Sequence, residues 1–265
     1  MTAPGMLSAP QFADPLAPFF PQGAAIRRIH SEGIILFGGG RALLMQVAHP
    51  KVAAGVAEHS SFRDGKRRRL LRTLQPTLAI VFGTQAQALQ AAAVVNAVHA
   101  RVRGDGYRAD DPELLFWVLA TLIDTALFMH ERFLGPVGWA DQEAYYQDML
   151  AAGELLGVRR DLAPADIGGF REYMASMVPA LQVTDAARGI AADLFDGRGA
   201  TWTGGVLLRE MTAALLPPSL REAYAMPTHV PAPDVVAGAV RAMLRLTPRV
   251  VRQTPAFLLP AGARL

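Results

Sequence analysis

Apolar residues in this chain recur at spacings of three and four, and few segments alternate between apolar and polar residues. A spacing of three and four places side chains on one face of a helix, whereas strict alternation is typical of a strand. Alanine and leucine, both strong helix formers, prevail among the apolar residues. The pattern therefore predicts an all-α fold with very little sheet.

Helix boundaries follow from proline, glycine and capping residues. Residues 1–23 are rich in proline and are predicted to form an irregular arm, followed by one helical domain over residues 24–265. The three glycines at 38–40 indicate a loop or hinge, and Pro76 is expected to interrupt a helix. The helices are predicted at residues 24–30, 41–48, 50–58, 64–75, 84–102, 111–133, 141–156, 164–177, 184–195, 203–216, 218–224, 233–246 and 248–257.

The chain is unusually apolar. Hydrophobic residues make up 51% and charged residues 18% of its 265 positions, against a charged share of about 25% in typical domains. A chain of this length can bury roughly 70–75% of the surface that it exposes when unfolded, which leaves room for an apolar ligand pocket. Cysteine is absent, so disulfides, thiolate metal sites and a cysteine-ligated haem are excluded.

The longest apolar run extends from Leu114 to Met129 and covers 16 residues. It is shorter than the roughly 18–20 residues of a membrane span, so we expect a central buried helix. The N-terminal segment lacks the basic and apolar regions of a secretory signal. These features predict a cytoplasmic protein without a transmembrane segment, and they leave peripheral membrane contact open.

The segment GKRRRLLRTLQPT, residues 65–77, holds the densest positive charge in the chain. Arg69 and Thr73 lie four residues apart and share a helix face, with Arg72 beside them. A guanidinium there could bind a carboxylate, a propionate or an oxygen species. The alternative is a solvated basic face, above all at residues 66–68. A nucleic-acid interface is not predicted, because the cluster lacks interleaved aromatic residues and the net charge is only +3.

His99 lies within the long alanine-rich helix. Its neighbours at helical spacings are mostly small or apolar, namely Ala92, Val95, Asn96 and Val102. Such a histidine is either a core residue with satisfied hydrogen bonds or a metal ligand, and the spacing alone leaves both interpretations open. Small flanking side chains would leave room for a flat cofactor.

Three further titratable residues are candidates for chemistry or for ion pairing. Glu58 and His59 end a predicted helix, where they could serve acid–base catalysis or make polar helix-end contacts. Asp124 lies in the apolar helix, where a buried carboxylate requires a cationic partner, so we expect a structural ion pair. The candidate partners of Asp124 are Arg69, Arg72, Arg132 and the histidines.

Five segments occur in an order that resembles a known family: GGGRALLMQVAHPKVAAGVAEHSSF, RLLRT, VFGT, VNAVHARVRG and YRADDPELLFWVLATLIDTAL. Over roughly residues 26–180 the chain is similar to the oxygenase family of latex-clearing proteins (rubber oxygenases) and MpaB-like enzymes. The resemblance implies a globin-like helical core that holds one haem b, with extra helices at the C-terminus. It also implies a haem-dependent oxidoreductase, since characterised members cleave C=C bonds of isoprenoid chains with dioxygen.

Carried over onto this chain, the resemblance implies that His99 is the proximal iron ligand and that Arg69 and Thr73 form the distal pair beside the cofactor. Arg72 occupies the position of a lysine that can reach the iron in the characterised rubber oxygenase. A guanidinium stays protonated and is a poor metal ligand, so Arg72 is expected to contact the cofactor without capping the iron.

Glu58 is the nearest match to the family's catalytic glutamate, and His59 is the alternative in the same space. The resemblance thus implies a haem b oxygenase that acts with dioxygen or peroxide on a small apolar, isoprenoid-like or secondary-metabolite substrate. A non-catalytic helical carrier of an apolar ligand or lipid is the alternative, and a carrier would have no need of His99. A homodimer stays open, and no nucleic-acid partner is expected.

Overall fold

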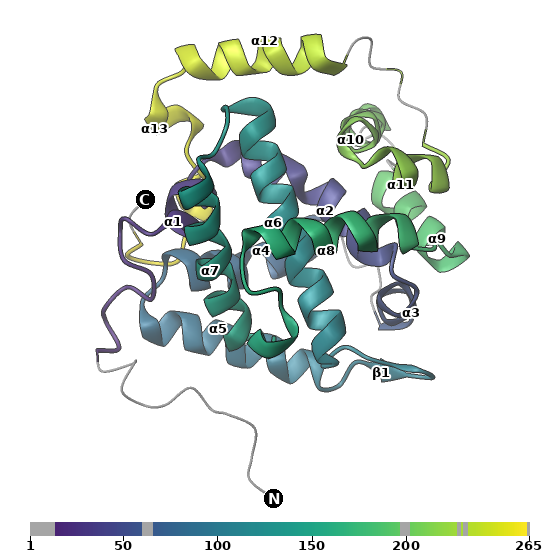
Figure 1. The fold of residues 1–265 in the computed structure, drawn as a ribbon, viewed down its shortest axis with the longest axis horizontal. Helices are drawn as coiled ribbons and strands as arrows, with labels where there is room; N and C mark the ends of the chain where they lie inside the picture. The colour runs from purple at the N-terminus through teal and green to yellow at the C-terminus, as the bar shows by residue number, and fades with distance from the viewer. Residues whose placement is uncertain (1–13, 60–65, 197–201, 227–228, 230–232, 264–265) are drawn as a thin grey trace, which may run out of the picture.

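The computed structural model describes residues 14–59, 66–196, 202–226, 229 and 233–263, without the side chains of residues 66–73, 202–203 and 233–234. Within these ranges the chain is almost entirely helical, which confirms the all-α prediction. The helices surround one central helix, and one helix near the C-terminus lies along the outside (Figure 1).

The elements follow one another without a repeat. The α-helices are α1 (Ala25–His30), α2 (Gly39–Val47), α3 (Pro50–His59), α4 (Lys66–Phe82), α5 (Gln85–His99), α6 (Pro112–Phe133), α7 (Trp139–Leu155), α8 (Ile167–Ala180), α9 (Asp185–Phe195), α10 (Trp202–Leu215), α11 (Pro218–Ala223), α12 (Pro233–Leu246) and α13 (Arg249–Arg252). Short 3-10 helices are η2 (Gly33–Gly38), η4 (Arg160–Leu162) and η6 (Ala256–Leu258). Strands β1 (Arg103–Gly104) and β2 (Tyr107–Arg108) form one antiparallel hairpin.

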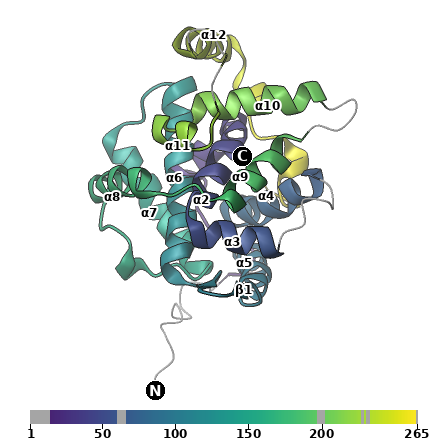
Figure 2. The same cartoon turned by 90° about the vertical axis from the view of Figure 1, so that its right-hand side faces the viewer.

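Helix α6 is the centre of the fold. It packs against α2, α7, α12 and η2, and two perpendicular views place it among the other helices (Figures 1 and 2). Trp117, Ile123 and Met129 on this helix are at most 1% exposed. Its 22 residues are long and apolar enough to cross a membrane, but 67% of its most apolar window is buried inside the protein. The burial agrees with the central buried helix that the sequence predicts.

Side-chain caps begin three of the longer helices, close to the helix starts that the sequence predicts at residues 84, 111 and 184. At the start of α5, Thr84 and Gln87 form a reciprocal capping box, each side chain accepting a hydrogen bond from the other's backbone N–H. Asp111 caps α6 and Thr184 caps α9 through the same kind of side-chain oxygen. These caps satisfy backbone N–H groups that have no partner inside the helix.

The glycines at 38–40 do not form the loop or hinge that the sequence predicts. Helix η2 runs directly into α2, so the chain stays helical. A Cβ at Gly38 would lie 2.6 Å from Thr125 Cγ2, and a Cβ at Gly40 would lie 2.2 Å from Thr212 Oγ1. Glycine is required at positions 38 and 40 because α6 and α10 pack directly against this backbone.

The break predicted at Pro76 is also wrong, because α4 continues through this residue. Proline removes one backbone donor and crowds the preceding turn of a helix. The residues that follow it, Leu78, Ile80 and Val81, are only 1–2% exposed. Burial of this apolar segment outweighs the local cost of the proline.

Helix α5 ends at His99 instead of Val102, and the glycines behind it belong to the β1–β2 hairpin, which the sequence does not predict. Arg103 lies opposite Arg108 across the hairpin. Gly106 in the turn has a φ of +74°, a conformation that favours glycine. Two residues per strand are too few to show alternation, so the pattern contained no strand signal.

Both ends of the described chain pack on the domain. Residues 14–23 contain no α-helix, as predicted for the arm, but Phe20 is only 5% exposed and Pro18 bridges to Thr84. At the other end, the helix predicted for residues 248–257 is divided into α13 and η6, with Pro255 preceding η6.

Arg41 in α2 joins three helices inside the fold. Its guanidinium donates to Asp124 Oδ2 and Thr125 Oγ1, both at 2.7 Å, and to the Leu215 carbonyl at 2.9 Å. It also lies 4.6 Å from the centroid of the Phe128 ring. Asp124 therefore forms an ion pair, as predicted, but its partner is a residue 83 positions away that was not among the candidates.

Candidate functional site

Helix α5 buries one narrow stripe of small side chains that ends in a histidine. Ala88, Ala92, Val95 and His99 are four, three and four residues apart, so they share one helix face. The two alanines are 0% and 3% exposed, and the valine and histidine are half-buried. The opposite face of α5 is exposed and carries Leu89, Val94 and Val98.

The imidazole of His99 has a nitrogen without a partner. Its Nδ1 atom is buried and makes no hydrogen bond to any described residue. Burial lowers the pKa of His99 below its ordinary value, and the charge of Asp110 opposes this only in part. The ring is therefore neutral at physiological pH and retains an unused nitrogen, which are the two properties that a metal ligand requires.

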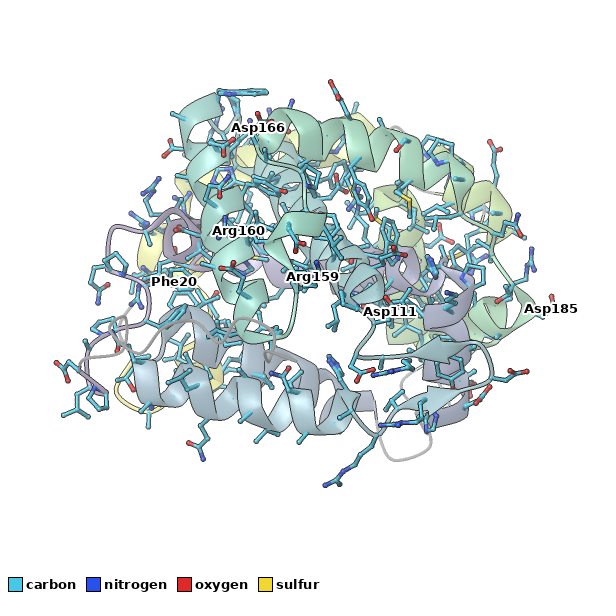
Figure 3. All side chains as sticks on the ribbon, turned by 60° about the horizontal axis from the view of Figure 1, so that its bottom comes forward. Phe20, Asp111, Arg159, Arg160, Asp166 and Asp185 are labelled. Carbon is cyan, nitrogen blue, oxygen red and sulfur yellow. The ribbon has the colours of Figure 1, made fainter. Side chains whose placement is uncertain are left out.

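A second unpartnered imidazole lies at the junction of α2 and α3. The Nδ1 atom of His49 is buried without a hydrogen bond to the residues that the structure describes. Burial and then Lys51 lower the pKa of His49, while Asp111 and Glu113 raise it. Asp111 lies at the N-terminus of α6 (Figure 3). His49 and His99 thus interact electrostatically with carboxylates of the same short segment, residues 110–113.

Sequence reasoning assigned no role to His49. The signal that could have found it is the dipeptide His49-Pro50, because proline at the first position of α3 fixes the preceding residue at a helix junction. His49 is partly exposed, and the atom that lacks a hydrogen bond to the described residues is its buried Nδ1.

Glu58 and His59 meet the β1–β2 hairpin at the end of α3. The hydroxyl of Tyr107 donates to Glu58 Oε2 at 2.6 Å, and His59 Nε2 lies 3.2 Å from the Arg103 carbonyl oxygen. Burial, and secondarily this carboxylate, raise the pKa of Tyr107 to about 12. Glu58 and His59 are themselves exposed, and none of the hydrogen bonds recorded for the described residues connects either of them to His99.

The close fit of Tyr107 depends on α3 as well. A Cβ at Gly55 would lie 3.2 Å from the Tyr107 ring, so the glycine lets the ring pack against the helix. Tyr107 is only 6% exposed as a result. The sequence motif around Tyr107 gave no hint of this pair, since the glutamate is 49 residues away.

The predicted distal residues Arg69, Arg72 and Thr73 lie in the first half of α4, a helix that packs principally against α5. Their side chains lie outside the described residues, so their predicted contacts stay predictions. These three residues nevertheless lie on α4, and α4 packs against α5, the helix that ends in His99.

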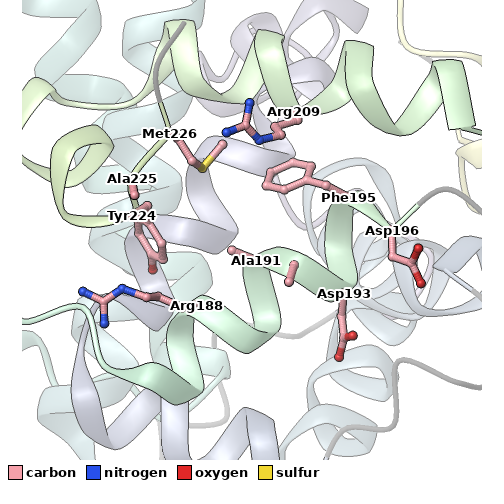
Figure 4. A pocket seen from close by; sticks show the side chains of 10 residues that line it. Arg188, Ala191, Asp193, Phe195, Asp196, Arg209, Tyr224, Ala225 and Met226 are labelled. Carbon is pink, nitrogen blue, oxygen red and sulfur yellow. The ribbon is translucent and has the colours of Figure 1, made fainter.

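A cavity of about 580 Å³ opens between α9, α10 and α11 (Figure 4). Its wall includes Arg188, Phe195, Arg209 and Tyr224, and it contains none of the predicted site residues. Among the described residues, no group of three or more His, Asp or Glu side chains is arranged to hold a metal ion. A bare metal site is therefore not indicated for this part of the chain.

Haem iron needs fewer protein ligands than a bare metal ion, because the porphyrin supplies four nitrogens and one imidazole can complete the site. His99 offers such an imidazole, neutral and with an unpartnered Nδ1, on a stripe whose other members are small. His99 is thus the described residue suited to supply the single imidazole that haem b would require, whereas no cluster of described residues is arranged for a cofactor-free metal centre.

The chain is an all-α domain, and comparison with known proteins specifies its family. Residues 26–253 match the family described as "ER-bound oxygenase mpaB/B'/Rubber oxygenase, catalytic domain", and the chain belongs to this family.

Among curated proteins, the chain is similar to an uncharacterized protein of Mycobacterium bovis and to an uncharacterized protein of Mycobacterium tuberculosis. It is 32% identical to each over 169 residues, which are 58% of this chain and 65% of each relative. The matched segment thus spans slightly less than two thirds of either relative. No solved structure matches the chain.

Proposed function

We propose that this protein is a haem b-dependent oxygenase that acts on a small apolar substrate, with His99 as the protein ligand of the iron. Membership of an oxygenase family supports the reaction class. The observation that carries the cofactor assignment is the buried, unpartnered Nδ1 of a histidine whose burial keeps it neutral. The high hydrophobic content, 51% of residues, supports an apolar substrate.

Haem iron, when bound, supplies the activation of dioxygen, and the protein supplies binding, orientation and electrostatics. We assign to Arg69 and Thr73 the donation of hydrogen bonds that orient dioxygen and stabilise developing negative charge. Both lie one helical turn apart on α4, which packs against α5. Arg72 beside them is suited to a propionate carboxylate, because its guanidinium is a permanent cation.

The pair of Glu58 and Tyr107 is our candidate for moving a proton. With its pKa near 12, Tyr107 keeps its own proton at neutral pH and donates a hydrogen bond to Glu58 Oε2. This contact orients the carboxylate and leaves its other oxygen available to accept a proton. His59 on the same helix end is the alternative base, and its Nε2 is engaged by the Arg103 carbonyl.

The cofactor assignment is tested by purifying the protein from cells supplied with a haem precursor and measuring haem per chain by its Soret band and pyridine haemochrome. We expect haem in the wild type and its loss in His99→Ala. His130→Ala is the matched control, because His130 lies on α6 with its Nδ1 already engaged at 3.2 Å by the Gly135 carbonyl. A colourless wild type that takes up no added haem would contradict the proposal.

The distal assignment is tested separately by turnover. Arg69→Ala should keep haem and lose at least about tenfold in turnover, a conservative figure for one charge-stabilising donor. Arg159→Ala is the control, because Arg159 is an exposed residue paired with Asp161 outside the site. Native mass spectrometry of the wild type distinguishes the carrier alternative, which predicts bound lipid and no haem.

A further inference from the structure

Helix α12 lies along the outside of the fold and is fixed there by α6 (Figures 1 and 2). The Arg241 guanidinium donates to the carbonyl oxygens of Glu131 and Arg132 at 2.9 and 2.7 Å, at the C-terminal end of α6. Ala237 on the same side of α12 is 6% exposed. The orientation of α12 about its own axis is therefore defined by its inner contacts.

The face of α12 that points away from α6 is apolar too. Val235, Val236, Met243 and Leu246 are 70%, 43%, 58% and 87% exposed. At 100° per residue Val235, Met243 and Leu246 lie on the side opposite Ala237, together with Ala239 and Ala242, and Val236 lies at the flank. Arg241 and Arg245 lie together next to Ala237, so the helix is amphipathic. An amphipathic helix ordinarily buries its apolar side against protein or lipid, and the apolar side of α12 is open to solvent.

The apolar exposure continues into α13. Val250 and Val251 there are 76% and 70% exposed. We call the six residues Val235, Val236, Met243, Leu246, Val250 and Val251 the outer apolar surface. Monomeric proteins rarely expose many large apolar side chains in one region unless the region contacts a partner or a membrane.

Arginine is the charged residue of this region. Residues 235–265 contain five arginines and no Asp, Glu, Lys or His, and the last acidic residue of the chain is Asp234. Arg245 and Arg249, within and directly after α12, are both exposed. The nearby carboxylate of Glu32 is buried and pairs with Arg252 at 3.2 Å and, more distantly, with Arg249 at 4.0 Å. Arg245 is therefore the arginine of the two that forms no ion pair with a described residue, and the Arg249 side chain stays 62% exposed.

We propose that the outer apolar surface binds an anionic lipid surface. Valine, methionine and leucine side chains enter the boundary between headgroups and acyl chains, and Arg245 and Arg249 contact lipid phosphates at its edge. A second copy of the chain is the less favourable occupant, because a two-fold contact presents the same arginines from both sides and the surface contains no carboxylate to pair with them. This inference does not depend on the haem assignment.

The test is co-sedimentation of the full-length protein with vesicles of phosphatidylcholine alone and of phosphatidylcholine mixed with phosphatidylglycerol. We expect binding to the mixed vesicles that weakens with added salt. The double variant Met243→Ser, Leu246→Ser should bind at least about tenfold more weakly, since burial of one large apolar side chain alone is worth about that factor. The variant Arg245→Gln should bind mixed vesicles about fivefold more weakly and lose part of the salt dependence, as expected for one arginine near an anionic lipid surface.

Val94→Ser is the matched control, because Val94 is 59% exposed on α5, away from α12. It should bind vesicles as the wild type does, and all variants should keep the wild-type melting temperature because the substituted side chains are exposed. The proposal is overturned by absence of binding to mixed vesicles, or by equal binding of the α12 double variant. It is also overturned if sedimentation without lipid finds a dimer that Met243→Ser, Leu246→Ser converts to a monomer.

Discussion

Helices α5 and α6 are both apolar in sequence, and they bury very different side chains. Helix α6 buries twelve residues, among them Leu114, Phe116, Trp117 and Ile123. Helix α5 buries two alanines and then places the half-buried Val95 and His99 on the same stripe. Large side chains of α6 fill the space between helices. Helix α5 contributes little volume and ends in an imidazole whose Nδ1 has no hydrogen-bond partner among the described residues.

The difference separates a helix that holds the fold together from a helix that is suited to hold a ligand. Polar groups on α6 are satisfied by protein, as shown by the contacts of Asp124 and Thr125 with Arg41. The polar group at the end of α5 is not satisfied by any described residue. Substitutions around α6 should therefore reduce stability and leave the haem content unchanged. Substitutions at the end of α5 should reduce the haem content and leave stability unchanged.

The largest stability effect is expected at Arg41. Arg41→Ala leaves Asp124 without its cation and should lower the free energy of unfolding by about 3 kcal/mol, as for other half-broken buried pairs. Chemical denaturation of the variant measures this. Arg28→Ala is the control, since it removes an exposed pair with Asp141 and should cost at most about 1 kcal/mol. If Arg41→Ala lost haem and kept its stability, the separate roles assigned to α5 and α6 would be contradicted.

Close packing on α6 and α10 predicts the next effect. Gly40→Ala places a Cβ 2.2 Å from Thr212 Oγ1, and Thr212 is 2% exposed, so we expect a loss of about 1–3 kcal/mol. Gly39→Ala meets nothing within 4 Å and should be neutral or slightly stabilising. Equal melting temperatures of the two variants would contradict the packing role of these glycines.

A pH dependence of the folding stability follows from His30, which lies at the end of α1 against Tyr145 of α7. Burial lowers the pKa of His30 from 6.5 to about 4, and its Nε2 lies 3.0 Å from the Tyr145 hydroxyl. Below pH 6.5 the unfolded chain binds a proton that the folded chain refuses, so stability falls as pH decreases towards 4. From pH 7 to pH 5 His30 should account for a loss of about 2 kcal/mol.

Urea unfolding of the wild type and His30→Gln at these two pH values measures that contribution. The variant cannot titrate there and should show a smaller decrease in stability between pH 7 and pH 5. The same decrease in both proteins would show that folding does not lower the pKa of His30.

The smallest effect is expected at the hairpin. Tyr107→Phe removes the hydrogen bond to Glu58 and should lower kcat about threefold to tenfold without changing haem content or KM, because it acts by positioning the carboxylate. Tyr173→Phe, which removes a hydroxyl on α8, is the control and should leave kcat unchanged. A raised KM with an unchanged kcat would place the Glu58–Tyr107 pair in substrate binding instead.

Local signals in the sequence were sufficient to predict much of the fold. The helix starts at residues 84, 111 and 184 were predicted from local signals, and α6 was recognisable from its apolar run, because these features depend on neighbours in the chain. Predictions failed where a distant element decided the outcome. The glycines at 38–40 stay helical because α6 and α10 approach them, and α4 continues through Pro76 because its second half is buried.

The candidate site shows the same division. His99 could be selected from the sequence because its small neighbours at helical spacing are local information. That its Nδ1 has no hydrogen-bond partner among the described residues could not be predicted. Whether a ring nitrogen finds a partner depends on every element that packs around it. The Glu58–Tyr107 pair joins residues 49 positions apart, and the Arg41–Asp124 pair joins residues 83 positions apart, so neither could be read from spacing.

The central claim is that the imidazole at position 99 is the protein's iron ligand, and ligand replacement tests it most directly. His99→Gly should fold with wild-type stability and retain no haem through gel filtration. Added imidazole should restore protein-bound haem with the wild-type absorption spectrum, because the free ligand replaces the missing side chain. Retention of haem at the wild-type level by His99→Gly without imidazole would contradict the claim.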